Sequence, residues 1–132
     1  MEDQKPSERR LTSRQVLQRY ADEELPEFAG MSLTDVNQKG GFRNAPLNIA
    51  ATRGEADEVS ALLDGGADIN IRGEHDCTPL HDAVGQGHVA VVKLLLSRGA
   101  STTPKDDSGL SAKDIALKRG PKEIADLFTD DD

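Results

Sequence analysis

Aromatic residues, cysteine and long apolar runs are all scarce in this 132-residue chain. Aromatic residues make up only 3% of it and tryptophan is absent, so Leu, Val, Ile and Ala must fill the core. The single cysteine, Cys77, excludes an intramolecular disulfide and any multi-cysteine metal site. No stretch approaches the roughly 18 consecutive apolar residues of a membrane-spanning helix.

Basic residues are also few, because 16 Lys and Arg stand against 24 Asp and Glu, for a net charge of −8. This acidic balance argues against binding to nucleic acid or to an anionic membrane surface. The opening segment, MEDQKPSERR, has no apolar run behind its charges, so no secretory signal is expected. Together with the lone thiol, this favours a cytoplasmic location, and the length suits one domain.

An internal repeat of 33 residues organises the chain. The segments APLNIA, TPLHDA and SAKDIA begin at positions 45, 78 and 111. Glycines recur in the same register at 54, 87 and 120, and Asp35-Val36-Asn37 recurs as Asp68-Ile69-Asn70. So many matches in one register indicate a protein built from stacked repeats.

Each unit is predicted to form two short helices. In the middle unit Thr78 can cap a helix that begins at Pro79, and Gly85 and Gly87 are expected to end it. Apolar residues at helical spacing then predict a second helix, which Gly99 closes. Helices this short are unstable alone in water, so they must stack on neighbouring units.

The middle unit, CTPLHDAVGQGHVAVVKLLLSRGAS, resembles an ankyrin repeat, including the T-P-L-H-x-A signature. NAPLNIAATRGEADEVSALLDGGADIN is a looser copy, and SGLSAKDIALKRGPKEIADLF resembles a C-terminal capping repeat. The resemblance implies an all-α solenoid of helix-turn-helix units joined by hairpin-like loops. It also implies a function in binding other proteins, with a partner that differs from member to member.

On this basis the chain divides into a disordered N-terminal tail (1–10), a degenerate N-terminal capping repeat (11–41), two ankyrin repeats (42–74 and 75–107), a C-terminal capping repeat (108–128) and an acidic tail (129–132). In the first capping repeat, Thr12 and Gln15 have the spacing of a capping box. Leu25 and Phe28 are expected to supply its second helix, closed by Gly30.

The resemblance assigns structural roles to Thr78, Pro79, His81, Gly87 and Gly99. Thr78 and His81 match the positions that fasten the hairpin turn and bridge to the next repeat. The equivalent residues are Ala45 and Asn48 in the repeat before, and Ser111 and Asp114 in the unit after. Ala45 cannot cap a helix, whereas Ser111 and Asp114 can form a capping box.

No catalytic, metal or cofactor site is expected. His75, His81 and His88 lie near Cys77, but their spacings fit no paired zinc pattern. No glycine pair has the sequence context of a phosphate-binding loop. The acidic pairs fall in turns, helix starts and the tail, with nothing beside them to raise a pKa. We therefore expect a protein that is not an enzyme.

The resemblance implies a partner-binding surface on three hairpin tips, residues 38–43, 71–76 and 104–108, and on the inward face of each first helix, which together form a concave groove. Its residues are Lys39, Phe42, Arg43, Arg53, Arg72, Glu74, His75, Gln86, Lys105 and Arg119. Phe42 is the aromatic residue that falls at a tip, and Gly40 and Gly41 are expected to adopt positive φ and let it reach outward. Two alternatives stay open for Phe42: a partner contact, or packing back onto the N-terminal unit.

The sequence thus predicts a monomeric module that binds another protein through its tips and concave face. One alternative is an inhibitor or immunity protein that blocks a toxin or enzyme, for which an acidic surface suits a basic target. Another is a scaffold or adaptor without inhibitory action. A third is an assembly subunit that stacks through its capping faces.

Overall fold

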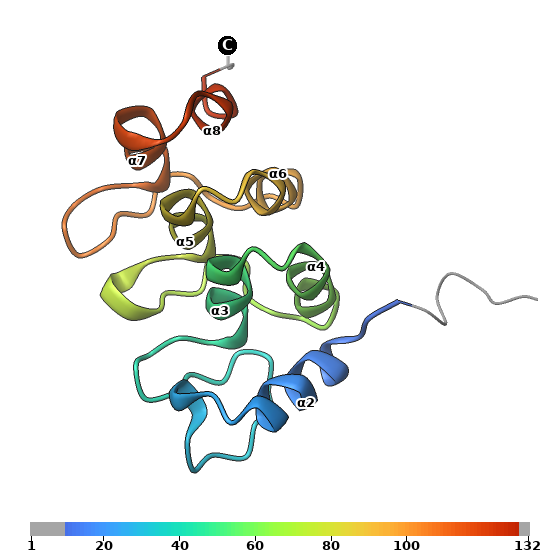
Figure 1. Cartoon of the computed structure of the whole chain (residues 1–132). Coiled ribbons are helices and arrows are strands. Elements are labelled where there is room, and N and C mark those ends of the chain that lie inside the picture. Colours follow the sequence, from blue (N-terminus) through green and yellow to red (C-terminus); the bar gives the residue numbers. More distant parts are fainter. Residues whose placement is uncertain (1–9, 130–132) are drawn as a thin grey trace, which may run out of the picture.

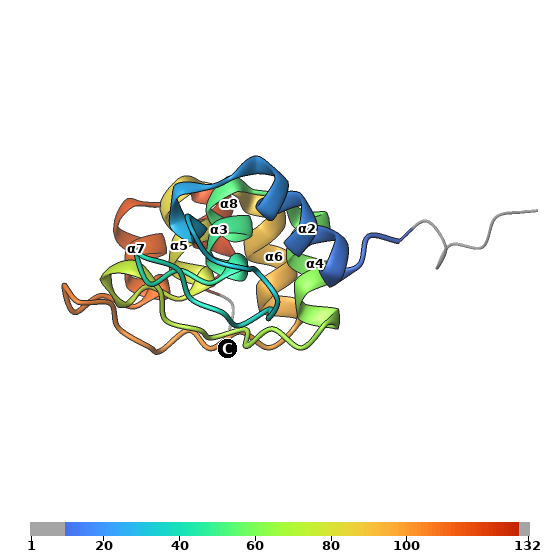
Figure 2. The same cartoon turned by 90° about the horizontal axis from the view of Figure 1, so that it is seen from below.

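The computed structural model describes residues 10–129. The predicted disordered tail (1–10) and acidic tail (129–132) therefore lie outside the described residues, apart from Arg10 and Thr129. Within the described part, helices stack in two columns and long loops leave from one side of them (Figures 1 and 2).

Seven α-helices and two 3-10 turns make up the regular structure of residues 10–129. They are α2 (Ser13–Glu23), η1 (Pro26–Phe28), α3 (Pro46–Arg53), α4 (Ala56–Asp64), η2 (Glu74–Asp76), α5 (Pro79–Gln86), α6 (Val89–Ser97), α7 (Ala112–Arg119) and α8 (Lys122–Asp126). The inner column contains α3, α5 and α7, and the outer column contains α2, α4, α6 and α8 (Figure 1). The predicted all-α solenoid is confirmed.

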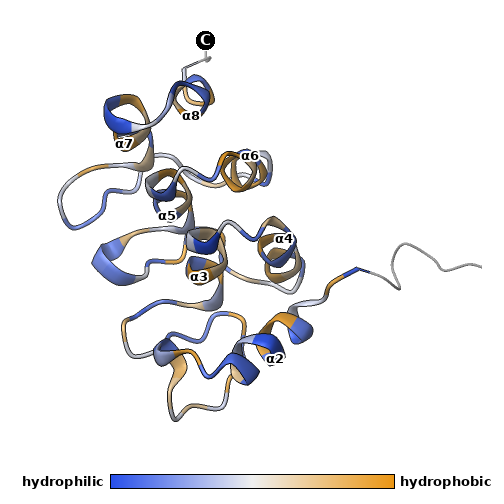
Figure 3. Ribbon diagram, viewed as in Figure 1, coloured by the Kyte–Doolittle hydropathy of each residue, from blue (hydrophilic) through white to orange (hydrophobic). Residues whose placement is uncertain are grey.

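The core lies where the two columns meet. Small and branched aliphatic side chains fill it, because the chain has almost no aromatic residues. The hydrophobic segments of the ribbon concentrate on the stacked helices, whereas the η2 tip is hydrophilic (Figure 3). The fully buried members include Leu47, Leu62, Leu80, Val91, Val92, Leu95 and Ile124. Each helix buries one face, which is how units too short to fold alone are stabilised.

Helix capping follows the sequence closely. Thr12 with Gln15 and Ser111 with Asp114 both form capping boxes, at the starts of α2 and α7. Before α3, Asn48 Oδ1 accepts the Ala45 backbone N–H at 2.8 Å, which is the reciprocal half of a capping box. The other half is missing because the Ala45 side chain has no acceptor, so α3 begins without its N-cap hydrogen bond. Gly85 does not end α5 as predicted, because it lies inside the helix and Gly87 is the cap.

The N-terminal unit departs from the prediction of two helices. Only the 3-10 turn η1 (Pro26–Phe28) forms there, so the expected second helix through Leu25 and Phe28 is wrong. The helix that does form, α2, packs against α4 and occupies the outer column. The η1 turn lies below α3 in Figure 1, where an inner helix would stand in a complete unit. The turn ends at Gly30, whose φ of 77° is outside the helical range, so no further helical turn follows.

A buried carboxylate ties α2 to α4. Glu58 is 3% exposed, accepts the Tyr20 hydroxyl and forms an ion pair with Arg19 at 2.9 Å. Burial, together with this hydrogen bond, raises the pKa of Tyr20. The contact explains why α2 sits in the outer column, since a buried carboxylate must be paired and hydrogen-bonded.

Candidate functional site

The three hairpin tips share one backbone closure. Gly40 N–H donates to Asn44 O, Gly73 N–H to Cys77 O, and Asp106 N–H to Leu110 O, at 2.8–3.0 Å. These three bonds repeat at the 33-residue period. The tips are therefore ordered hairpin-like loops that project on the same side of the molecule (Figure 2).

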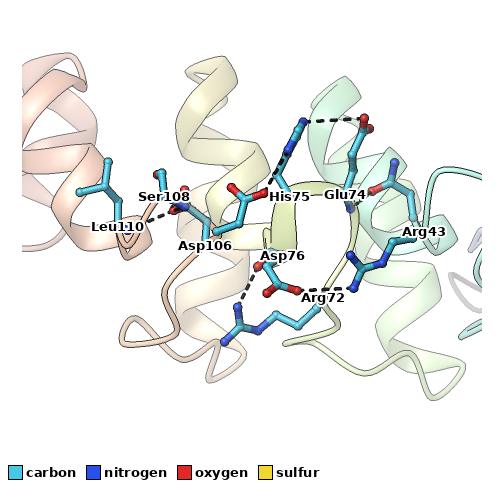
Figure 4. Close-up of polar contacts among 10 residues, drawn as sticks. Arg43, Arg72, Glu74, His75, Asp76, Asp106, Ser108 and Leu110 are labelled. Atoms are coloured by element: carbon cyan, nitrogen blue, oxygen red, sulfur yellow. Dashed lines mark hydrogen bonds and ion pairs between the residues drawn. The ribbon is translucent and has the colours of Figure 1, made fainter.

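Neighbouring tips are also fastened to each other. We call these contacts the tip ladder, which Figure 4 shows in part. Arg43 of the first tip pairs with Asp76 of the second at 3.6 Å, and His75 of the second pairs with Asp107 of the third at 3.3 Å. The Arg72 guanidinium donates to the Asp76 and Lys105 backbone carbonyls at 2.8 and 2.6 Å. The predicted tip residues thus form one continuous surface.

This geometry changes the interpretation of two predicted binding residues. Arg72 is half-buried and its guanidinium donates to two backbone carbonyls, so it fastens the second tip to the third. Arg53 is bound by Glu23 through two contacts, at 3.0 and 3.4 Å, and lies over the Tyr20 ring. It therefore links α3 to the N-terminal unit. Exposed members of the predicted set are Lys39, Phe42, Arg43, Arg53, Glu74, His75, Gln86, Lys105 and Arg119.

A buried carboxylate below the first tip sets its conformation. Glu27 is 7% exposed, and it accepts the backbone N–H groups of Phe42 at 2.8 Å and Asn44 at 3.1 Å. It also accepts the Asn44 side-chain amide at 2.9 Å. The side-chain oxygen of Asn44, Oδ1, in turn accepts the Glu74 backbone N–H at 3.0 Å, which joins the first tip to the second.

The predicted positive φ at Gly40 and Gly41 is wrong, because the residue in that conformation is Arg43, with φ 77°. Gly40 is needed for a different reason: a Cβ there would collide with the Glu27 backbone carbonyl. The outcome for Phe42 is nevertheless clear. Its backbone is tied to Glu27 while its side chain is 54% exposed, so it does not pack into the N-terminal unit.

A concave groove lies beside the tips, between α3, α5 and the η2 turn. One pocket of about 280 Å³ in this groove, which we call the groove pocket, is lined by Asn44, Asn48, Ile49, Thr52, Arg53, Glu74, His75, Cys77, Asp82 and Gln86. Four of the predicted binding residues are among them. Gln86 also borders a second hollow, shared with Arg119, where α5 meets α7. Thus Arg53 and Gln86 line the groove pocket, and Gln86 and Arg119 line the second hollow, with 33 residues between successive members.

Asp82 and Cys77 in the groove pocket both have raised pKa values. Desolvation raises the pKa of Asp82 to about 7, opposed by a hydrogen bond from the Asn48 side chain and assisted by the charge of Glu74. Burial raises the pKa of the Cys77 thiol to about 12, assisted by the charges of Asp82, Asp106, Asp107 and Asp76. Cys77 is therefore a neutral thiol at physiological pH and a poor nucleophile.

Thr78 and His81 connect two repeats. Thr78 Oγ1 accepts the His81 N–H at 3.3 Å, and His81 Nδ1 accepts the Thr78 N–H at 3.0 Å. Because Nδ1 is an acceptor, Nε2 carries the proton and donates to Leu110 O at 2.9 Å. Pro79 is the first residue of α5. Gly87 follows the end of α5 and Gly99 follows the end of α6, and both have positive φ, at 75° and 91°.

We expect His81→Ala to lower the free energy of unfolding by about 1–3 kcal/mol, because it leaves the Thr78 N–H without its acceptor and removes one of the two hydrogen bonds that the Leu110 carbonyl accepts. Urea titration monitored by circular dichroism measures this change.

A chelator should leave the melting temperature of the wild type unaltered. In residues 10–129 no group of three or more His, Cys, Asp or Glu is placed to hold a metal. A marked loss of stability on chelation would contradict a structural role for His81.

Sequence reasoning missed three acidic residues. Asp82 occupies the repeat position at which the other units have Ile49 and Ile115, and Glu58 occupies the position of Val91. Comparing the units position by position reveals both as charged residues at largely buried sites. Glu27 has no such signal, because its burial depends on the first tip folding over it.

Comparison with known proteins gives one match. A family model described as ankyrin repeats, in three copies, matches residues 17–106, which is more than half of the chain. A search of curated proteins finds no match. The described part of the chain also contains no helix that is long and apolar enough to cross a membrane.

Proposed function

Because the chain belongs to the ankyrin-repeat family, we propose that it binds a partner protein through the tip ladder and the groove beside it. Ankyrin repeats generally bind other proteins, and the family is typically non-enzymatic. The observation that carries the proposal is the continuity of this surface. Three ordered tips, one exposed Phe42 and the groove pocket all lie on adjoining parts of the molecule.

The surface is suited to recognition because its shape is set before binding. Ion pairs and hydrogen bonds between neighbouring tips already hold the loops in place. The loss of loop entropy on binding a partner is therefore small. An exposed aromatic side chain next to cations is the kind of anchor from which interfaces draw most of their energy. We further propose that the protein acts as a monomer and has no catalytic role of its own.

The test is capture of the partner by the intact protein, followed by binding measurements with two variants. Gln86→Arg places a longer side chain in the groove from an exposed position, so we expect it to abolish or strongly weaken binding. The matched control is Gln18→Arg, on the exposed face of the outer helix α2, which should bind normally. Equal binding by both variants contradicts the groove as the binding surface. Whether the partner loses its own activity when bound separates an inhibitor from an adaptor.

A further inference from the structure

The groove pocket has the composition of a receptor for one positively charged side chain. Asp82 projects from the inner helix α5 among Asn48, Glu74 and Cys77, and it is partly buried. In the other units this position holds Ile49 and Ile115. A carboxylate at an apolar position of a repeat has to be compensated, because a desolvated charge without a partner is costly.

That compensation is incomplete in the free protein. Asp82 receives a hydrogen bond from the Asn48 side chain, but within residues 10–129 it forms no ion pair. The two basic side chains at the pocket are held elsewhere: Arg53 is bound by Glu23, and His75 lies between Glu74 and Asp107. The charge that would neutralise Asp82 is therefore not supplied by the pocket itself.

The surroundings of Asp82 add to its negative potential. The charges of Asp76, Asp106 and Asp107 act on Cys77, a neighbour of Asp82 in the pocket lining, and raise the pKa of its thiol. Glu74 raises the pKa of Asp82 in the same way. The apolar side chain of Ile49, in contrast, offers a surface for a hydrocarbon stem. Lysine and arginine combine such a stem with a charged end.

We propose that the groove pocket binds a lysine or arginine side chain of the partner protein, with the Asp82 carboxylate as its counter-ion. This inference rests on the proposed function, because the partner supplies the side chain. It adds the chemistry of the partner: a protein that presents a basic residue to the groove.

Binding of a cation requires the ionised form of Asp82, which fixes the sign of the pH dependence. Since the pKa of Asp82 is raised to about 7, the carboxylate loses its proton as pH rises through neutrality. Affinity for a cation should therefore rise about tenfold between about pH 6 and pH 8. Other titratable groups face the pocket: Arg53 from α3, and Glu74, His75 and Cys77 from the second tip and the segment after it. Of these, His75 carries an imidazole, so its replacement by glutamine serves as a control for the pH dependence.

The experiment uses three blocked tripeptides, Gly-Arg-Gly, Gly-Lys-Gly and Gly-citrulline-Gly, titrated into the full chain and followed by amide NMR shifts. Citrulline matches arginine in shape but is neutral. We expect saturable shifts around Asp82, Glu74 and Gln86 in the millimolar range for one or both cationic peptides and none for citrulline. The variant Asp82→Asn should bind at least tenfold more weakly, and His75→Gln should keep the pH dependence.

Three results would overturn the proposal: equal shifts with citrulline, equal affinity of Asp82→Asn, or no saturable shift with either cationic peptide. A well-dispersed amide spectrum of Asp82→Asn shows that the variant folds. The neutral amide also avoids the cost of burying a charge. Because the peptides need no natural partner, this outcome is independent of the Gln86→Arg capture experiment. The proposed function can therefore stand when the peptide test fails.

Discussion

Deleting residues 109–132 is expected to abolish cooperative thermal unfolding or to cause aggregation. The deletion removes α7, which packs on α5, and α8, which packs on α6. It exposes the apolar faces of the preceding unit, including Val91 and Leu95, which are fully buried in the intact protein. In a repeat array each unit contacts only its neighbours, so a terminal unit stabilises the one before it.

The deletion also removes a polar contact, because Leu110 O is the acceptor for His81 Nε2. A single substitution in α8 tests the same stabilising role with a smaller expected effect. Ile124 is fully buried in α8, and Ile124→Ala should lower the free energy of unfolding by about 2–5 kcal/mol. Differential scanning calorimetry measures both variants. A truncated chain that melts like the intact protein would show that α7 and α8 do not act as a cap.

The stacked helices could be predicted because their signals are local and repeated. An apolar stripe and a closing glycine recur at fixed spacing from Ala45 to Gly120, and proline begins the first helix in two of the three units. Each signal is weak alone, but the common register makes them support one another. The failure came at residues 25–30, where the repeat signature is missing and only the short turn η1 forms. There the buried pair of Glu58 and Tyr20 decides the position of α2, and a pairing between residues 38 apart leaves no local pattern.

The candidate site was predictable in outline and not in detail. The positions of the three tips followed from the repeat. The contacts between tips did not, because whether Arg43 meets Asp76 or a partner depends on how far each loop reaches. The role of Gly40 shows the same limit. Glycine was expected there for its conformational freedom, but the requirement is space for the Glu27 carbonyl, which comes from tertiary packing.

Replacing Phe42 by alanine is expected to weaken partner binding by about 2 kcal/mol or more, which is about thirtyfold in the dissociation constant. The reason is chemical. Phe42 is an aromatic side chain that is 54% exposed, on a tip whose backbone is held in place. The loss of a partly exposed side chain removes little buried surface, so the free energy of unfolding should change by no more than about 0.5 kcal/mol.

The backbone contacts of the first tip explain why Phe42→Ala should change affinity but not stability. Glu27 holds the Phe42 N–H, not its ring, and alanine retains that N–H. The tip should therefore keep its shape in Phe42→Ala while it loses the anchor. Glu27→Ala acts in the opposite way: it leaves the ring in place but frees the backbone donors of the tip. We expect that variant to lower both stability and affinity.

Leu117→Ala is the matched control, because Leu117 is 47% exposed on α7, away from the first tip. It removes a comparable amount of exposed apolar surface and should leave both affinity and stability unchanged. Isothermal titration calorimetry and urea unfolding on the same preparations separate the two quantities. A lower stability of Phe42→Ala with unchanged affinity in the folded fraction would remove Phe42 from the binding surface. Equal losses of affinity in Phe42→Ala and Leu117→Ala would show that apolar exposure in general, and not the first tip, controls association.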